Sequence, residues 1–168
     1  MSMVQGVVVG LVTDVRVDGC VKVHFPWLDQ CHQSDWIRVA SVMAGKDRGA
    51  FFMPEVDDEV LLAFQHGDAN HPFVIGFLWN GVDLPPGKHV RDRVFKSKNG
   101  HSIRFLDTTP SGGNKGAIVI EDAHRNRITL SNGQVSIRSR NAVVIEGSSI
   151  VFKVNGVPRV VTPSGNPI

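Results

Sequence analysis

Short runs of alternating apolar and polar residues, separated by turns that contain glycine or proline, follow one another along the whole chain. No long stretch has the apolar spacing of a helix, so the pattern predicts an almost all-β protein. The longest near-apolar run, Gly6 to Val12, is much shorter than the roughly 20 residues that a membrane-spanning helix needs. We therefore expect no transmembrane helix.

The first half of the chain predicts a small barrel. Asp18-Gly19 is a hairpin signal, and Gly6 and Gly10 are interpreted as places where a strand bends or bulges. The polar stretch that contains Ala44-Gly45 and Arg48-Gly49 is expected to be a loop. Short strands with this much glycine predict a Greek-key barrel of the OB type over residues 1–85. The expected strands are 4–17, 20–25, 36–42, 59–64 and 73–78.

The second half has shorter strands in a tighter rhythm. Several are separated by Asn-Gly or Gly turns, such as Asn132-Gly133. In Ile128-Thr129-Leu130 the outer residues are apolar and the middle one is polar, so such a strand buries only one face. The expected strands are 103–105, 118–120, 128–130, 135–137, 143–145 and 150–154.

A zigzag of such short strands has too little apolar surface on one side to form a core alone. We expect three copies to wind into an intertwined triple-stranded β-helix, in which each chain supplies one strand in turn to each face of a prism. Strand edges would then pair between chains. An ordinary β-sandwich is the alternative. The expected trimer core is Ile103, Phe105, Ile118, Ile120, Ile128, Leu130, Val135, Ile137, Val143, Ile145, Ile150, Phe152 and Val154.

The charge distribution supports two domains. The net charge of +2 combines −6 in residues 1–85 (5 Lys and Arg, 11 Asp and Glu) with +8 in the remainder (13 and 5). Hydrophobic residues make up 42% and charged residues 20%, a globular composition. We expect an OB-fold domain over 1–85, a linker over 86–94 that follows Pro85-Pro86-Gly87, and a β-helical needle over 95–168.

Candidate catalytic and metal-binding patterns are weak. The seven histidines show no zinc-finger spacing, and no serine has the nucleophile context G-x-S-x-G. Glu121 and Asp122 are neighbours in a strand, so they point to opposite faces. We expect no enzyme, no catalytic residue, no metal and no cofactor. Cys20 and Cys31 are too few for a disulfide scaffold, and no Lys or Arg precedes Asp14, so we expect cytoplasmic synthesis without a signal peptide.

An OB-type barrel also suggests nucleic-acid binding, the alternative function. OB folds bind single strands through a basic groove and exposed aromatic side chains. The charge of −6 on the barrel half opposes this use, because phosphate binding depends on Lys and Arg. We therefore expect no specific nucleic-acid partner.

Ordered motifs in the first half resemble a known family. Val21 to Trp27 (VKVHFPW) and Trp36 to Ala40 (WIRVA) are similar to stretches of phage baseplate spikes and VgrG-type spikes. Residues 95–103 and 118–122 are similar to the opening of that family's trimeric β-helix. The family-motif positions of the OB domain are Phe25, Pro26, Trp27, Trp36, Arg38, Pro54, Glu59, Gly67, Asp68, Pro72 and Gly76.

The resemblance implies the homotrimeric central spike of a contractile injection system, such as a phage tail or tailocin. The barrel would sit on the baseplate hub protein, and sheath contraction would drive the needle into the target cell envelope. Three positions depart from the family pattern: Cys20 and His71 replace Arg, and Asp57 replaces Gly. Residues 160–168 contain no His or Cys, so the resemblance implies a separate PAAR-type tip protein in place of a bound tip metal. It would contact Val160, Val161, Pro163 and Pro167.

Overall fold

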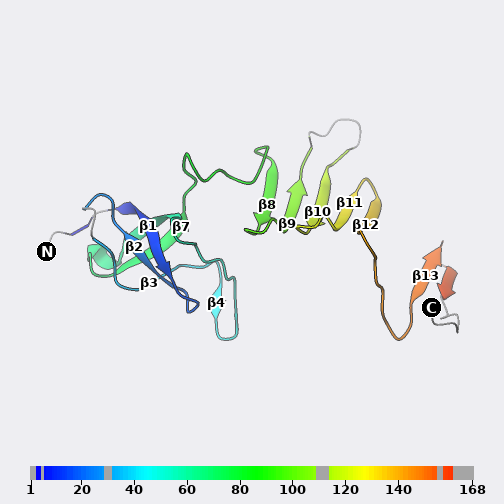
Figure 1. Cartoon of the computed structure of the whole chain (residues 1–168), viewed down its shortest axis with the longest axis horizontal. Coiled ribbons are helices and arrows are strands. Elements are labelled where there is room, and N and C mark those ends of the chain that lie inside the picture. The colour runs from blue at the N-terminus through cyan, green and yellow to red at the C-terminus, as the bar shows by residue number, and fades with distance from the viewer. Residues whose placement is uncertain (1–2, 5, 29–31, 109–113, 155–156, 161–168) are drawn as a thin grey trace. The chain divides into compact units, whose positions relative to one another are not determined.

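A computed structural model describes residues 3–4, 6–28, 32–108, 114–154 and 157–160. The chain divides into two compact units, Met1–Pro85 and Pro86–Ile168 (Figure 1). Within the described residues, every regular element except the single 3-10 turn η1 (Gln65–Gly67) is a strand. The all-β prediction is therefore confirmed.

The first unit is built around one antiparallel sheet in the order β3-β2-β1-β6-β7. Val39, just beyond β3, forms a parallel bridge with Val74 of β7, and the Ala40 N–H donates to the Val74 carbonyl at 2.8 Å. Because the first and last strands of the sheet meet in this way, the barrel is nearly closed, as predicted. The strands are β1 (Val7–Val15), β2 (Cys20–His24), β3 (Ile37–Arg38), β6 (Glu59–Phe64) and β7 (Pro72–Phe77).

The barrel core follows the period-two alternation of the strands. In β2 and β6 every second side chain is buried. Val21 and Val23 therefore lie in the same core as Val60 and Leu62. Phe25 packs against Phe64 with ring centroids 6.5 Å apart. The residues that alternate with them, Lys22 in β2 and Leu61 and Ala63 in β6, are half-buried on the other face, so the barrel buries a core with one chain only.

Gly10 serves packing and not the bend or bulge that the sequence suggested. A Cβ at this position would lie 2.3 Å from Cγ1 of Val23 and 2.7 Å from Cδ1 of Leu62. The irregularity of β1 instead falls between Val12 and Asp14, where its register with β2 shifts. Gly10 is therefore required because two core side chains fill the space above its Cα.

The turns that precede β2 and β6 use left-handed backbone. Gly19, with φ of +88°, follows Asp18 in the β1–β2 hairpin, as predicted. Asp57 has φ of 76°, and its N–H donates to the Val12 carbonyl at 2.8 Å. Asp57 thus adopts the conformation for which glycine is best suited, at the position where the resembling family has glycine.

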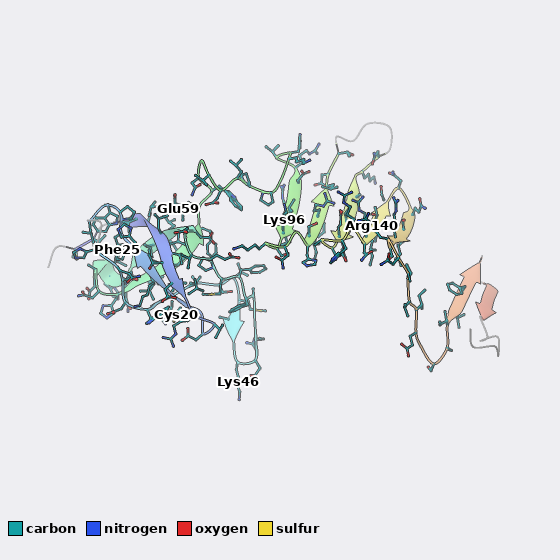
Figure 2. The ribbon with its side chains drawn as sticks, viewed as in Figure 1. Cys20, Phe25, Lys46, Glu59, Lys96 and Arg140 are labelled. Carbon is teal, nitrogen blue, oxygen red and sulfur yellow. The ribbon has the colours of Figure 1, made fainter. Side chains whose placement is uncertain are left out.

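Two predictions for the first unit were wrong. The strand expected over 36–42 is limited to β3, because the chain leaves β2 after Val39 and bonds to β7. The expected loop contains a hairpin of two short strands, β4 (Ala44–Gly45) and β5 (Arg48–Gly49), with Lys46 at its tip (Figure 2). Asp47 supplies the left-handed turn, with φ of 56°.

The second unit contains an antiparallel meander in the order β12-β11-β10-β9-β8. Its strands lie side by side in chain order (Figure 1). A separate two-stranded sheet pairs β13 (Val151–Val154) with β14 (Val157–Val160). The meander begins at Asp92, inside the segment 86–94 that was expected to be a linker. Its strands are β8 (Asp92–Lys96), β9 (Ser102–Leu106), β10 (Ala117–Glu121), β11 (Arg127–Ser131) and β12 (Gln134–Arg138).

Strand pairing in the meander differs from the expected exchange between chains. Each strand pairs with its neighbour in the sequence, within one chain. The β11–β12 turn explains this, because Asn132 and Gly133 both have positive φ, 51° and 76°. Two such residues form the tight turn whose twist matches a hairpin, which forces the flanking strands together.

The strand expected over 143–145 is absent. Residues 139–150 contain no strand, and the side chains of Val143 and Ile145 are exposed. A strand needs a neighbouring edge for its backbone N–H and C=O groups, and residues 143–145 pair with no described strand, although the outer edge of β12 is free. The prediction from β-branched composition was therefore wrong for the single chain.

We predict that Gly10→Ala destabilises the barrel by about 1–3 kcal/mol, because overpacking displaces Val23 and Leu62. The matched control is Gly76→Ala in β7, where an added Cβ meets nothing within 4 Å. Chemical denaturation of both variants measures the difference. Equal stability of the two variants would show that the space above Gly10 is not limiting.

Replacement of Asp57 by glycine should raise the free energy of unfolding of the barrel by up to about 1 kcal/mol, because glycine adopts positive φ without a steric cost. Asp35 lies outside the left-handed region, so Asp35→Gly is the control and should lower stability. Thermal and urea unfolding compare the two. A destabilised Asp57→Gly variant would contradict the strain argument.

Candidate functional site

One face of the β8–β12 sheet is almost wholly apolar. Strand register places Ile118 opposite both Phe105 and Leu130, and Ile120 opposite both Ile103 and Ile128. The same face continues onto the neighbouring strands in register, so the side chains form rows across the sheet. We call this the apolar face. Its members are Phe95, Ile103, Phe105, Ile118, Ile120, Ile128, Leu130, Val135 and Ile137.

The apolar face is uncovered in the single chain. Its side chains are between 37% exposed, at Ile128, and 65% exposed, at Val135. Among the described residues of the second unit, Val119 is the one buried large apolar side chain, and it lies on the opposite face of β10. Contiguous apolar patches of this kind are rare on monomers and mark surfaces that bind something.

The opposite face is polar and is covered by its own long side chains. Arg104 lies opposite Val119 in the β9–β10 ladder, and its Nη2 donates to Oε2 of Glu121 at 2.6 Å. Arg127 Nη2 donates to the same Glu121 oxygen at 2.8 Å. This network links β9, β10 and β11 on the polar face, so the uncovered side of the sheet is the apolar face.

The predicted trimer-core residues fall into two groups. Eight of them lie on the apolar face, from Ile103 in β9 to Ile137 in β12. Val143, Ile145 and Ile150 lie outside any strand, and Phe152 lies in β13. Val154 ends β13, and its side chain is outside the described residues.

Phe95 is the one member of the apolar face that the sequence reasoning missed. It lies opposite Ile103 in the β8–β9 ladder. The signal was the apolar pair Val94-Phe95 between charged residues, just before the Asn99-Gly100 turn. That segment was divided between linker and needle, which concealed a complete strand.

The family-motif residues of the OB domain build the barrel and do not converge on a cleft. Phe25 and Pro54 are buried, whereas Pro26, Trp27 and Arg38 are exposed. Phe25 also meets Trp27 edge to face, with centroids 6.1 Å apart. Glu59, Pro72 and Gly76 are half-buried members of β6 and β7.

Asp68 and Trp36 organise polar surface around the barrel. Asp68 accepts hydrogen bonds from the Asn70 N–H and from Nδ1 of His71, both at 2.9 Å, and these donors lower the pKa of Asp68. His71, at a position where the resembling family usually has Arg, thus bonds to this carboxylate. Trp36 lies beneath Arg16 and Lys22, with the cations 4.9 and 5.1 Å from its ring centroid.

No three His, Cys, Asp or Glu side chains among the described residues gather closely enough to hold a metal ion. Cys31 and the expected tip contacts Val161, Pro163 and Pro167 lie outside the described residues, as does the side chain of Val160. No described helix has the length and apolar character to cross a membrane.

Comparison with known proteins identifies the class of the barrel. Residues 4–79 match the family described as the type VI secretion system/phage-baseplate injector OB domain. The first unit therefore matches the injector OB domain over nearly its whole length, and the chain resembles VgrG-type spike proteins. The resemblance to baseplate and VgrG-type spike proteins, noted from the motif residues, is confirmed.

Curated relatives include spike proteins of type VI secretion systems. The chain is 35% identical over 109 residues to VgrG5 of Pseudomonas aeruginosa, across 62% of this chain and 13% of that protein. It is 37% identical over 73 residues to VgrG3 of Vibrio cholerae, across 40% of this chain and 7% of that protein. A third relative, 32% identical over 72 residues (40% of this chain, 7% of the relative), is the actin cross-linking toxin VgrG1 of Vibrio cholerae. The matches thus span about an eighth or less of these relatives.

The Glu121 network should make the second unit sensitive to acid. Hydrogen bonding from Arg127 lowers the pKa of Glu121, and the charges of Arg104 and Arg125 add to this effect. A lowered pKa in the folded state means that the ion pairs stabilise the fold at neutral pH. That stability is lost as the pH falls through the folded-state pKa.

We predict that Glu121→Gln destabilises the second unit by about 1–2 kcal/mol at neutral pH. The difference from the unmodified chain should shrink as the pH falls through the lowered folded-state pKa of Glu121, below the usual range of a glutamate. Hydrogen exchange at the amides of β10 and β11 measures both effects. The exposed Glu146→Gln is the control, and an equal effect there would contradict a specific role for Glu121.

Proposed function

We propose that the chain is the central spike of a type VI secretion system, phage tail or related injection apparatus, and that it acts as a homotrimer. The observation that carries this proposal is the uncovered apolar face of the β8–β12 sheet in a chain whose other unit matches the injector OB domain. Burial of one Ile, Leu, Val or Phe side chain contributes about 1.5–3 kcal/mol. A surface of nine such side chains strongly favours self-association.

Three copies suit the shape of this face. Each five-residue strand from β9 to β12 presents only two apolar side chains, so the face is a narrow ribbon that runs across the strands. Three ribbons directed at a common axis enclose a continuous apolar core, and their polar faces remain in water. The resemblance to trimeric spikes favours this arrangement over a two-sheet sandwich.

We further propose that the prism has two kinds of construction. Over 92–138 each protomer would contribute one whole side, because its strands already pair within the chain. Over 139–150 the exposed Val143 and Ile145 have no strand partner in their own chain. Here segments of the three protomers would wind around one another without forming strands in their own chains, so the intertwined part of the prism would be confined to these residues.

Mechanically, the trimer would transmit axial force to a target cell envelope when a sheath contracts. The barrel would attach it to the baseplate hub protein, and a PAAR-type protein would cover its tip. The chain would act without catalysis or cofactor. It would be assembled into the baseplate from the bacterial cytoplasm. A single-stranded nucleic-acid binder is not favoured, since the barrel unit carries a charge of −6.

Ile137→Asp tests the trimer. Light scattering of the unmodified chain should give three times its 18.3 kDa. The variant should dissociate to monomers, because a charged carboxylate in each protomer would be buried near the axis. Ser136→Asp is the matched control, since this neighbour in β12 points to the polar face and should leave the trimer intact.

Two outcomes would overturn the proposal. One is a folded, monodisperse monomer of the unmodified chain. The other is a trimer of unchanged stability in the Ile137→Asp variant, which would show that the apolar face is not the contact. A dimer in both would favour the sandwich alternative over the prism.

A further inference from the structure

Four arginines gather at one end of the β10–β12 strands. Arg125 lies in the β10–β11 turn, Arg127 begins β11, Arg138 ends β12, and Arg140 follows two residues later. Together they line a pocket of about 350 Å³. Among the described residues, these four arginines make up its whole lining. We call this group the arginine cluster. Figure 2 labels Arg140 beside β12 and Lys96 at the other edge of the same sheet.

The backbone beneath the arginine cluster is fixed by Asn126. Its Oδ1 accepts hydrogen bonds from the Arg140 N–H and from the Ser139 hydroxyl, both at 3.1 Å. Its Nδ2 donates to Oδ2 of Asp122 at 2.8 Å. These bonds tie the end of β12 to the β10–β11 turn, so the side chains of Arg125 and Arg140 originate from anchored positions.

The charges in the arginine cluster are not balanced within the chain. Arg127 and Arg138 lie directly opposite each other in the β11–β12 ladder, an arrangement in which like charges repel. Glu121 is shared between Arg104 and Arg127. Among the described residues, no ion pair involves Arg125, Arg138 or Arg140.

The second nearby carboxylate is also occupied. Asp122 Oδ1 accepts hydrogen bonds from the N–H groups of His124 and Asn126, at 2.9 and 2.8 Å. Five arginines and two carboxylates leave a local charge of +3. This end of the sheet therefore lacks an anion.

We propose that the arginine cluster is a binding site for phosphate groups. The guanidinium group offers paired N–H donors in a rigid fork that matches the oxygens of phosphate. A phosphate dianion between Arg125, Arg138 and Arg140 would supply the missing charge and would relieve the repulsion between Arg127 and Arg138. The phosphate would be free in solution or would belong to the headgroup of an anionic lipid.

This site goes beyond the proposed spike function and does not depend on it. Arg127 and Arg138 belong to the face of the sheet that carries Glu121, opposite to the apolar face. Burial of the apolar face in a trimer would leave the arginine cluster open to water. A monomer would present the same four side chains.

Calorimetric titration of the full chain with inorganic pyrophosphate at low salt tests the site. The test variant carries Arg125→Gln, Arg138→Gln and Arg140→Gln, which leaves Arg127 paired with Glu121. Loss of three charge-assisted contacts should weaken binding by about tenfold or more. The control variant carries Lys88→Gln, Lys96→Gln and Lys115→Gln, which removes the same charge outside the pocket lining, and it should bind as the unmodified chain does.

Vesicle flotation distinguishes the two sources of phosphate. If the headgroup is the ligand, vesicles that contain phosphatidylglycerol should bind the unmodified and control chains but not the test variant. If free phosphate is the ligand, pyrophosphate should bind and the vesicles should not. Equal weakening in test and control variants, or no saturable binding by the unmodified chain to either probe, would overturn the proposal.

Discussion

The exposed apolar face of the β8–β12 sheet is the constraint on which the rest of the molecule depends. A sheet with one apolar and one polar face is stable in water only when the apolar face is removed from solvent. The barrel solves this problem within one chain, since Val39 and Val74 bring its edge strands together and enclose Val21, Val60 and Leu62. The second unit has no such closure, and its apolar residues stay at the surface.

Most of the strands could be predicted from the sequence because alternation is a direct consequence of strand geometry. Glu59–Phe64 and Cys20–His24 alternate between buried and half-buried positions, and both were found. The two-residue hairpin β4–β5 was missed because its strands are too short to show any period. The strand at 143–145 was wrongly predicted because β-branched residues indicate a preference, whereas a strand also requires a hydrogen-bonding neighbour.

The residues of the apolar face were predicted better than the pairing of the strands that carry them. Alternating side chains identified eight of the positions on the apolar face, from Ile103 to Ile137. Which strands pair with which was not accessible from alternation alone, since it depends on the backbone of single turn residues such as Gly133. The arginine cluster was not predicted from the sequence either, because Arg125 and Arg140 are brought together by one side chain, that of Asn126.

The Asn132-Gly133 turn has a consequence for the order of events during biogenesis. Contacts between sequence neighbours form quickly, within microseconds for a hairpin, long before separate molecules meet by diffusion. Each newly made polypeptide can thus complete its own β8–β12 sheet before it meets the other copies of the proposed trimer. Until it associates, its exposed apolar face can also drive aggregation. The rate of association in the proposed trimer would therefore compete with loss to aggregates.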